Sequence, residues 1–496
     1  MLRENHAVWR CGKHEISLAR PRIMGILNVT PDSFSDGGEN FDPELAVARG
    51  LEMLDEGADI IDVGGESTRP GHRPVSPEEE ARRIVPVVRG LVAGGAVVSV
   101  DTRHASVAKM CANLGAAIIN DVTGFTDPEM VKVAAETDCG CLVMHWDQEG
   151  LGTRAAGTAP ARKEVQLDVS RPSRPTAARP APAALATRGG VSQHRFTLPD
   201  QAPIMRQIMG FLGDQARILQ RAGVSHDRIC LDPGPGFDKF ADEDVVIQRA
   251  TRSMVSMGYP LCTAVSRKRF VGAVTAVEGA AARDAATQGI CIAAVANGSR
   301  VLRVHDVAGC AQAVNAYWAV AEKDARQGFV SLGSNVGERE ANLARAVQLI
   351  DQIPLTCVAN VSHAYETEPA YGIATPVANC VAEIRTELHP LVLMDHLLKV
   401  EDKLGRVRDP ERDPKKPGHT ARTIDCDLVW VEGETHQGNK LTLPHPRLGE
   451  RDYVIVPMED LMHNPTRFLE HGGVHVLPRE ERVGAVTADL GEIAWL

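Results

Sequence analysis

Hydrophobic and polar residues follow a regular rhythm through most of the first two thirds of the chain. A short apolar run is followed by a polar loop and then by an Ala-rich segment with helical spacing. Near-continuous apolar strands that alternate with helices are typical of a parallel sheet buried on both faces. Eight such units are what a (β/α)8 barrel of the TIM type requires, so we predict an α/β barrel. The eight runs are 23–28, 59–63, 97–101, 116–121, 141–145, 228–232, 260–266 and 300–306.

The pattern changes after a predicted helix at 308–323. The next segments indicate strand, helix, strand, strand, helix and strand, which is the order of a ferredoxin-like α+β domain. They are 329–334, 338–350, 358–369, 376–387, 391–405 and 423–431. We therefore divide the chain into a barrel at 1–323 and a second domain at 324–496.

The loop after the fifth barrel strand is unusually long. Residues 150–200 are rich in Ala, Pro and Arg and contain almost no large apolar side chains. Such a segment cannot bury enough surface to offset its ordering entropy. We predict a disordered insertion, and we favour a solvated spacer over a contact with an anionic substrate.

Composition and charge narrow the class of protein. Apolar residues make up 44% and charged residues 24% of the chain, as in an ordinary globular protein. The formal net charge of −11 leaves no basic footprint for nucleic acid. The sequence contains no signal-peptide pattern and no apolar stretch near the ~20 residues of a membrane span. We expect a cytoplasmic protein without nucleic-acid or membrane partners.

The eleven cysteines lack paired CxxC spacing, which argues against a zinc ribbon. Cys139 and Cys141 lie two apart on an expected strand, so their side chains face the same side. We interpret them as inert thiols rather than as reactive or metal-binding groups.

Every predicted barrel strand ends in polar residues, at the rim where active sites of such barrels lie. Hydrogen-bonded caps would explain two or three of these ends but not all eight. Amides and carboxylates can fix the edge of a planar heterocycle, while Arg and His suit a phosphate or diphosphate. The amide of Asn28 could supply an oxygen ligand to a Mg²⁺ ion that carries the diphosphate, and the polar loop 31–38 would close over the reacting centre. The ends offer Asn28, the loop 64–69, Asp101, Asn120 with Asp121, Met144 with His145, Asp232, Ser266 with Arg267 and Lys268, and Arg303 with His305.

The motifs at these ends resemble dihydropteroate synthase. They are MGILNVTPDSFSDGG (24–38), DVGGESTRPG (62–71), SVDT (99–102), INDV (119–122), LDPGPGF (231–237), SRKRF (266–270) and RVHDV (303–307). The resemblance covers residues 20 to 322 apart from the insertion. That family condenses 6-hydroxymethyl-7,8-dihydropterin diphosphate with p-aminobenzoate, which releases diphosphate and gives dihydropteroate.

The resemblance implies a role for each matching residue. It makes Asn28 the ligand of one Mg²⁺ ion, and Arg303 and His305 the anchors of the diphosphate. The implied pterin pocket consists of Asp101, Asn120, Met144, Asp232 and Lys268, and the implied p-aminobenzoate rim of Thr68, Arg69 and Ser266. It also implies a homodimer that forms through the barrel.

A second candidate site lies on the predicted strand 423–431. Asp425 and Asp427 stand two apart, so both carboxylates point to one face. Their mutual repulsion would be relieved by a pair of Mg²⁺ ions with a nucleoside triphosphate. Basic residues flank the strand in a proline-containing loop, as in a cationic lid over phosphates. They are Arg406, Arg408, Arg412, Lys415, Lys416 and Arg422. The alternative is a pair of exposed carboxylates beside a solvated basic loop.

The surrounding motifs resemble 6-hydroxymethyl-7,8-dihydropterin pyrophosphokinase, which transfers diphosphate from ATP to the pterin alcohol and leaves AMP. They are SLGSNVGERE (331–340), YETEPAYG (365–372), GRVRD (405–409), RTIDCDL (422–428) and LPHPRLGERDYV (443–454). The resemblance makes Asp425 and Asp427 the ligands of two Mg²⁺ ions, and Asn379 and Tyr453 contacts to the pterin. The implied ATP contacts are Arg406, Arg408, Arg422, His445 and Arg451. Two positions depart from the family: Val377 replaces an aromatic residue, and His419 replaces a lid tryptophan.

The product of the second reaction is the substrate of the first, so the two resemblances support each other. The sequence therefore predicts a bifunctional folate-biosynthesis enzyme with ATP as co-substrate. One alternative is an active pyrophosphokinase fused to a barrel that is weakened or only binds pterin. In this alternative the barrel is the impaired half, because it contains the insertion. Another is a barrel that transfers a methyl group from a folate, but it gives no use to Lys268 beside Arg303 and His305, or to the second domain.

Overall fold

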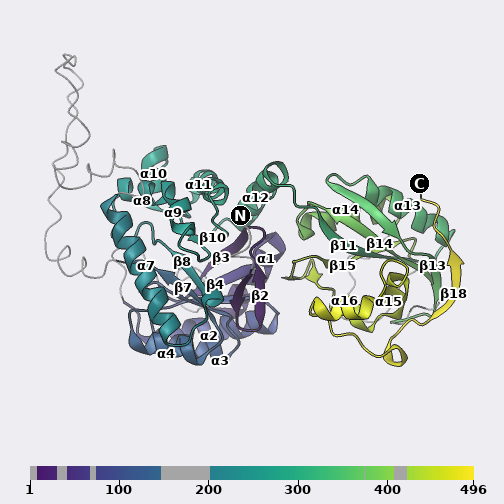
Figure 1. The fold of residues 1–496 in the computed structure, drawn as a ribbon, viewed down its shortest axis with the longest axis horizontal. Coiled ribbons are helices and arrows are strands. Elements are labelled where there is room, and N and C mark those ends of the chain that lie inside the picture. The colour runs from purple at the N-terminus through teal and green to yellow at the C-terminus, as the bar shows by residue number, and fades with distance from the viewer. Residues whose placement is uncertain are drawn as a thin grey trace, which may run out of the picture. The chain divides into compact units, whose positions relative to one another are not determined.

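The computed structural model describes residues 8–30, 42–66, 74–146, 202–371, 373, 375–406 and 422–495 (Figure 1). The chain divides into two compact units, Met1–Val314 and Asn315–Leu496. Each unit has its own sheets and its own hydrophobic cores.

Eight parallel strands form the centre of the first unit. Their spatial order is β8-β7-β6-β5-β4-β3-β10-β9, and a bridge between Leu231 and Leu261 joins the two end strands. This nearly closed ring confirms the predicted barrel. The strands are β3 (Arg22–Asn28), β4 (Ile60–Gly64), β5 (Val98–Asp101), β6 (Ile118–Asp121), β7 (Gly140–Met144), β8 (Ile229–Asp232), β9 (Cys262–Thr263) and β10 (Val301–Val304).

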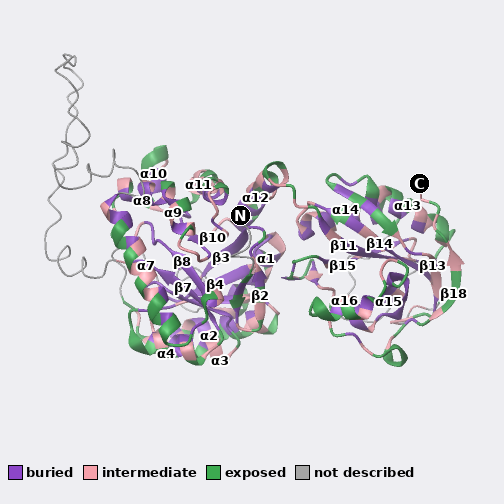
Figure 2. Cartoon of the chain, viewed as in Figure 1, coloured by how far each residue is buried: buried purple, intermediate pink, exposed green. Residues whose placement is uncertain are grey.

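Helices surround these strands, and the burial colours show the strands as the buried centre (Figures 1 and 2). Three of the helices begin at a side chain that accepts a backbone N–H, as sequence signals for helix starts predict. These caps are Asp42, Ser76 and Asp127. The helices are α1 (Pro43–Glu56), α2 (Pro77–Ala93), α3 (Ala105–Asn113), α4 (Pro128–Glu136), α7 (Pro203–Arg221), α8 (Ala241–Arg249), α9 (Thr251–Val255), α10 (Arg269–Thr275), α11 (Asp284–Ala296) and α12 (Val307–Ala321).

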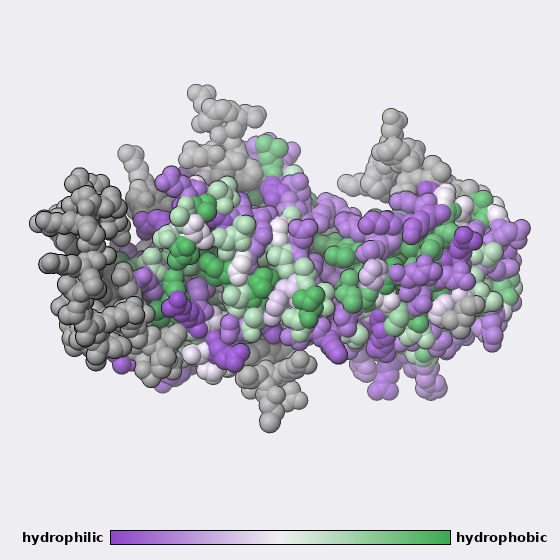
Figure 3. All heavy atoms as spheres, turned by 90° about the horizontal axis from the view of Figure 1, so that it is seen from above, coloured by the Kyte–Doolittle hydropathy of each residue, from purple (hydrophilic) through white to green (hydrophobic). Residues whose placement is uncertain are grey.

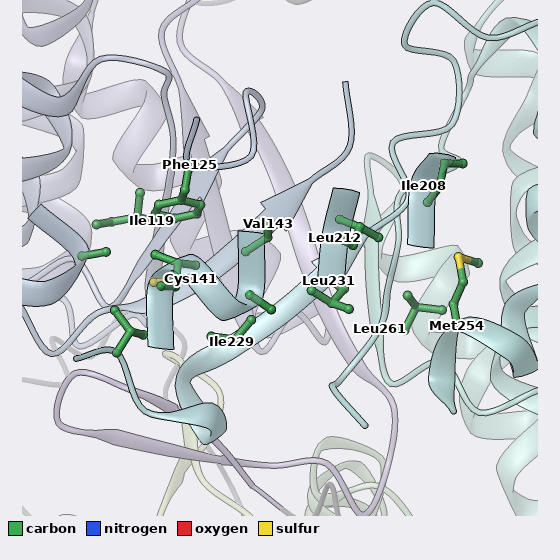
Figure 4. Packing of buried hydrophobic residues seen from close by; sticks show 14 of the residues in the cluster. Ile119, Phe125, Cys141, Val143, Ile208, Leu212, Ile229, Leu231, Met254 and Leu261 are labelled. Carbon is green, nitrogen blue, oxygen red and sulfur yellow. The ribbon is translucent and has the colours of Figure 1, made fainter. Parts of the chain in front are cut away.

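The outward faces of β6, β7 and β8 pack against α4, α7, α8 and α9 (Figure 4). Cys141 and Val143 belong to this outer core, whereas Leu142, between them, belongs to a separate core inside the barrel. Cys139 also lies in the outer core, as the predicted shared side requires. Burial raises the pKa of the Cys141 thiol to about 12, so this thiol is inert at neutral pH, as predicted.

A hairpin that the sequence analysis did not identify closes the amino end of the barrel. It consists of β1 (Val8–Cys11) and β2 (His14–Ser17), and Trp9 is fully buried in the inner core. The indole of Trp9 donates a hydrogen bond to the carbonyl oxygen of Arg228 at 3.0 Å. A Cβ atom at Gly140 would lie 2.5 Å from the sulfur of Cys11, so the close approach of this hairpin requires glycine there.

The second unit is a three-layer α/β structure. Its main sheet has the order β15-β11-β14-β13-β18, with β12 also paired to β14, and all its pairs are antiparallel. Helices α13 (Arg339–Asp351) and α14 (Pro390–Lys403) pack on one face, and α15 (Asp452–Met458) and α16 (Pro465–His471) on the other. The strands are β11 (Arg326–Ser334), β12 (Thr356–Val361), β13 (Ala364–Thr367), β14 (Val377–Thr386), β15 (Asp425–Val431), β16 (His436–Gln437), β17 (Thr442–Leu443) and β18 (Val486–Gly491).

The element order of the predicted ferredoxin-like fold is present, with two differences. The segment 358–369 forms two strands rather than one, because Ser362 interrupts it: its hydroxyl accepts the backbone N–H of Val381 at 2.9 Å. The last strand, β18, was not predicted, and it extends the sheet beyond β13.

On the face shown in Figure 3, hydrophobic and hydrophilic residues are interspersed. None of the described helices combines the length and hydrophobicity that crossing a membrane demands.

The packing of α7 can be tested with one buried and one exposed position. Leu212 is fully buried against the barrel, whereas Ile218 on the same helix is 41% exposed. Leu212→Ala should lower the free energy of unfolding by about 2–5 kcal/mol, because it leaves a cavity. Ile218→Ala should change it by less than about 1 kcal/mol. Calorimetry of the full chain measures both, and equal effects would contradict this account of the core.

Candidate active sites

The interior of the barrel changes from apolar to polar along the strands. Because side chains alternate along a strand, every second residue points inward. The lower inward residues are Met24, Ile60, Ile118, Leu142, Cys230, Cys262 and Val301. Two residues further along the same strands stand Ile26, Asp62, Asn120, Met144, Asp232, Ala264 and Arg303. Strand periodicity thus places Asp62, Asn120, Asp232 and Arg303 on the inward face at the carboxyl end of the barrel.

Arg303 is the centre of this polar group. Its Nε lies 2.6 Å from Oδ2 of Asp62, and its Nη2 lies 2.6 Å from Oδ2 of Asp101. The Nδ2 of Asn120 donates to the same carboxylate of Asp62 at 3.2 Å. One arginine on β10 therefore ties together side chains from β4, β5 and β6.

The sequence analysis did not identify Asp62 as a residue of the site. It is fully buried, and it accepts hydrogen bonds from both Arg303 and Asn120. The signal was available, because a carboxylate in the apolar run 59–63 stands two residues after Ile60 and so shares its inward face. A buried carboxylate requires partners, and only the fold shows which partners it has.

Burial and charge work against each other in this cluster. Burial raises the pKa of Asp101 to about 7, although Arg303 acts to lower it. Burial acts to lower the pKa of Arg303, but Asp62 and Asp101 outweigh this effect and raise it. The arginine therefore stays charged within this cluster.

Asp232 and Lys268 form the neighbouring part of the site. Asp232 accepts the backbone N–H of Gly234 at 2.7 Å, and burial raises its pKa. The ammonium of Lys268 donates to the carbonyl oxygen of Pro235 and lies 4.7 Å from the ring centroid of Phe237. Burial lowers the pKa of Lys268 to about 8, against the opposing effect of Asp232. A carboxyl and an ammonium at one rim can serve the donors and acceptors of a polar flat ring.

Ser266 links the last two strand ends. Its Oγ lies 2.9 Å from Nδ1 of His305 and accepts the backbone N–H of the same residue at 3.1 Å. His305 follows the end of β10, two residues after Arg303. The structure therefore brings together Ser266, His305 and Arg303 at one rim.

The other residues predicted for the barrel site lie in different environments. Asn28 ends β3 beside Gly64 of β4, and it is partly exposed. Met144 is buried at the end of β7. Asp121 instead accepts the backbone N–H groups of Thr123 and Phe125, both at 2.8 Å, so it shapes a turn. Thr68, Arg69, the polar loop 31–38 and the insertion 150–200 lie outside the described residues.

Glu66 belongs to the predicted loop 64–69, but the sequence analysis gave it no role of its own. It accepts Nε and Nη2 of Arg103 at 2.9 and 3.2 Å, and the backbone N–H of Val75 at 3.2 Å. One carboxylate thus ties the end of β4 to the start of the segment before α2 and to the end of β5. The sequence shows Glu66 only as part of a motif and does not show its role, because its partners are distant in sequence.

The second unit contains a cavity of about 270 Å³ on one face of its main sheet. Asp427 and Asp425 pair with Ser331 and Gly333 of β11, which fixes both carboxylates on this face. The helices α15 and α16 cover only the other end of the same face, where Phe329 and Val429 are buried. The cavity is lined by Ser331, Gly333, Asn335, Thr367, Glu368, Ala370, Tyr371, Ile373, Val377, Asn379, Arg406, Arg422, Asp425, Asp427, His445, Arg447, Arg451 and Tyr453.

Arginines neutralise the two carboxylates of β15. Arg406 and Arg422 both donate to Asp425, and Nη1 of Arg451 donates to Asp427 at 2.9 Å. Burial acts to lower the pKa of Arg406 and of Arg451, but the neighbouring carboxylates raise both. These ion pairs keep three cations inside a cavity that phosphate groups could enter.

The carboxylates also suit a divalent cation. Among the described residues, no group of three or more His, Cys, Asp or Glu side chains could hold a metal ion. Asp425 and Asp427 offer hard oxygen ligands from adjacent inward positions of one strand, and phosphate oxygens can complete such a shell. The donor set fits Mg²⁺ whose remaining ligands are phosphate oxygens.

Asn379 and Tyr453 form a polar and an aromatic wall of the cavity. Asn379 is buried, and its Nδ2 donates to Oγ1 of Thr367 at 2.7 Å. A Cβ atom at Gly333 would lie 2.8 Å from Oδ1 of Asn379, so glycine leaves that oxygen accessible from the adjacent strand. The guanidinium carbon of Arg451 lies 5.5 Å from the ring centroid of Tyr453.

His445 is neutral at physiological pH. Burial lowers its pKa to about 3, and Arg451 and Arg447 act in the same direction. Its Nδ1 accepts the backbone N–H of Arg447 at 3.1 Å, so the ring proton is on Nε2. A neutral imidazole with a free Nε2–H would serve as a hydrogen-bond donor.

The predicted residues of the second site meet in this one cavity. They are Asn379, Arg406, Arg422, Asp425, Asp427, His445, Arg451 and Tyr453, and Val377 also lines it. Tyr371 and Arg447 were missed: the hydroxyl of Tyr371 donates to Glu450 at 2.9 Å, and Arg447 lies 4.7 Å over the ring of Tyr371. Five further residues of this loop lie outside the described residues: Arg408, Arg412, Lys415, Lys416 and His419.

Comparison with known proteins adds a second line of observation. Residues 24–305 match the family described as pterin binding enzyme, and residues 329–463 match 7,8-dihydro-6-hydroxymethylpterin-pyrophosphokinase. The chain is 35% identical over 317 residues to a dihydropteroate synthase of Neisseria meningitidis serogroup C, which covers 63% of this chain and 97% of that relative. It is similar to a dihydropteroate synthase of Xanthomonas albilineans solved with 4-aminobenzoic acid, with a TM-score of 0.52, 32% identity, and coverage of 64% of this chain and 100% of that one. The same enzyme with 7,8-dihydropteroate gives a TM-score of 0.50 and 30% identity, with 64% and 100% covered.

The lowered pKa of Lys268 makes a prediction about stability. Its folded pKa of about 8 lies below the ordinary value of 10.5, so the buried charge costs stability below pH 8. Between these values the unfolded chain binds more protons, and stability rises with pH by up to about 1.4 kcal/mol per unit. The unfolding free energy of the natural chain minus that of Lys268→Met should therefore increase from pH 8 to pH 10. Calorimetry measures this difference in unfolding free energy from the unfolding transition of the barrel, which is the transition that Leu212→Ala shifts. A difference that stays constant or falls between pH 8 and pH 10 would contradict the lowered pKa of Lys268.

Proposed function

The chain belongs to the pterin-binding enzymes and, in its second unit, to the 7,8-dihydro-6-hydroxymethylpterin-pyrophosphokinases, and from this premise we propose how its residues carry out two consecutive reactions. It is a bifunctional enzyme of folate biosynthesis, with dihydropteroate synthase activity in the barrel and pyrophosphokinase activity in the second unit. The product of the second unit is the substrate of the barrel.

In the second unit, ATP and 6-hydroxymethyl-7,8-dihydropterin enter the cavity that Asp425 and Asp427 line. Asn379 and Tyr453 hold the pterin, Tyr453 by stacking on its ring. The three arginines that now neutralise Asp425 and Asp427 turn toward the phosphates, and His445 donates from Nε2. The carboxylates of Asp425 and Asp427 would hold Mg²⁺, which would offset the phosphate charge. The resemblance implies two such ions.

The transfer itself is in-line. The pterin hydroxyl oxygen forms a bond to the β-phosphorus of ATP and loses its proton, while the bond from that phosphorus to the oxygen of the α-phosphate breaks. AMP leaves, and the pterin carries the diphosphate. The protein contributes position and charge compensation rather than a covalent intermediate.

In the barrel, the pterin lies against Asp232, Asn120 and Lys268, and its diphosphate lies toward Arg303 and His305. The amide oxygen of Asn28 fits a single Mg²⁺ ion bound to the same diphosphate. The carbon–oxygen bond to the diphosphate breaks as the amine of p-aminobenzoate forms a carbon–nitrogen bond and loses a proton. Cationic groups stabilise the leaving diphosphate, so no protein nucleophile is needed. Ser266, Thr68 and Arg69 would face p-aminobenzoate.

One observation carries this assignment. Each site joins groups for a flat polar ring to cationic groups for a diphosphate: Asp232 with Lys268 and Arg303 in the barrel, and Asn379 with Arg451 in the second unit. A methyl-transferring barrel has no need for that cationic end.

The partners that we propose are small molecules and a second copy of the chain. The substrates need no nucleic-acid or membrane surface, and the location that we propose is the cytoplasm. Pairing through the barrel rests on the resemblance to dihydropteroate synthase alone.

A two-stage assay tests both activities. The full chain with Mg²⁺, 6-hydroxymethyl-7,8-dihydropterin, ATP and labelled p-aminobenzoate should form labelled dihydropteroate. Asp425→Ala and Lys268→Ala should each reduce this product at least about 100-fold. Added pterin diphosphate should restore it in Asp425→Ala only. AMP without dihydropteroate from the natural chain would mean an impaired barrel, which is the alternative with an active pyrophosphokinase alone.

Asp62 offers a sharper test of the barrel site. Asp62→Asn places an amide against the donors of Arg303 and Asn120, so kcat/KM for pterin diphosphate should fall about 100-fold through misplacement of Arg303. The matched control is Asp59→Asn, before the same strand, which loses the 3.0 Å ion pair with Arg22. That control should lower stability and leave kcat/KM nearly unchanged, with AMP formation intact in both variants. Equal kcat/KM in the two variants would remove Asp62 from the site.

A further inference from the structure

The carboxyl-terminal segment 473–491 lies beyond the part of the chain that matches the pyrophosphokinase family, which ends at residue 463. It nevertheless runs beside the residues that line the second cavity. Three backbone hydrogen bonds join it to the segment 449–452. Val483 donates to Glu450 at 2.9 Å, Asp452 donates to Val483 at 3.0 Å, and Leu477 donates to Gly449 at 2.9 Å.

The same segment also holds the opposite wall of the cavity. The backbone N–H of Glu368 donates to the carbonyl oxygen of Ala485 at 2.9 Å, and Val486 pairs with Thr367 in the sheet. Both Thr367 and Glu368 line the cavity. Within four residues, therefore, this segment is bonded to two cavity walls that come from distant parts of the chain.

A buried ion pair fixes the segment to α15. The carboxylate of Asp452 is 4% exposed, and it lies 3.4 Å from Nη1 of Arg482. The side chain of Arg482 is 7% exposed, and its Nε donates to the carbonyl oxygen of Leu477 at 2.9 Å. Such a paired and buried contact resists displacement, because breaking it leaves an uncompensated charge.

Gly484 touches the ring of Tyr453 directly. A Cβ atom at Gly484 would lie 2.4 Å from Cδ1 and 3.2 Å from Cε1 of that ring. The φ angle of Gly484 is +71°, so its backbone also favours glycine. The ring of Tyr453 thus rests on a backbone surface that has no room for a side chain.

We propose that residues 483–486 support two walls of the second cavity from behind and that Gly484 is a positioning residue, which sets the ring of Tyr453 for contact with the pterin. This inference rests on the proposed role of Tyr453. Gly484 does not touch the substrate; it acts through the tyrosine ring. This support thereby belongs to the pyrophosphokinase site although it lies outside the family match.

A pair of glycine variants tests this proposal in the full chain. Gly484→Ala and Gly473→Ala both place alanine at a positive φ, +71° and +80°, but a Cβ atom at Gly473 meets nothing within 4 Å. Both variants therefore carry similar backbone strain, and only Gly484→Ala displaces Tyr453. AMP formation is measured with the pterin alcohol and ATP varied separately.

We expect Gly484→Ala to raise KM for the pterin alcohol at least about tenfold relative to Gly473→Ala, with a smaller change in KM for ATP. Dihydropteroate formation from added pterin diphosphate should be equal in both variants, because that reaction uses the barrel. Equal pterin KM values in the two variants would overturn the proposal. Absence of AMP formation in the natural chain would instead overturn the proposed function.

A double-mutant cycle separates positioning from general damage. In a Tyr453→Ala background, Gly484→Ala should have no further effect on pterin KM, because its effect passes through the missing ring. Additive effects would show that Gly484 acts by another route and would overturn the proposal.

Amide hydrogen exchange of the natural chain keeps the proposal testable if Gly484→Ala does not fold. Pterin binding should slow exchange at Glu368, Asp452 and Val483, the three donors of this support. Unchanged exchange at all three in the pterin-saturated chain would also overturn it.

Discussion

Both sites depend on one constraint, the alternation of side chains along a β-strand. In the barrel it places Asp62 and Arg303 two residues after buried apolar partners, Ile60 and Val301, so the same inward face that forms the core below carries charge at the rim. In the second unit it places Asp427 two residues before Val429, on the face where α15 and α16 end. A shift of one residue in either strand would exchange the charged and apolar faces and remove the site with the core.

Burying several charges is unfavourable unless they compensate one another, and both sites meet this requirement in the same way. Arg303 bridges Asp62 and Asp101, while Arg406 and Arg422 converge on Asp425. These pairs keep the buried arginines ionised. The cost of desolvating these cations is thus met during folding, and the proposed function places a diphosphate beside arginines that are already ionised.

Each site is held in place by residues that do not line the site themselves. Glu66 ties two barrel loops together, and the hairpin around Trp9 fills the amino end of the barrel, opposite the rim. In the second unit the segment around Gly484 supports Tyr453. Such supports restrict the side chains that they touch, and a site that binds a rigid flat ring needs its walls held within a fraction of an ångström.

The sequence by itself determined the barrel, the ferredoxin-like order and the polar groups at the strand ends, because strand periodicity and strand ends are local properties, whereas Asn379, His445 and Tyr453 were candidates only through the family resemblance. It located Asn120, Asp232 and Lys268 in this way, and the spacing of Asp425 and Asp427 placed both carboxylates on one face. Only the tertiary structure decided which charges pair. Asp62 meets Arg303 across 241 positions of sequence, and β18 reaches β13 from the far end of the second unit. Long-range pairings of this kind depend on register and closure of the sheets, which no local pattern encodes.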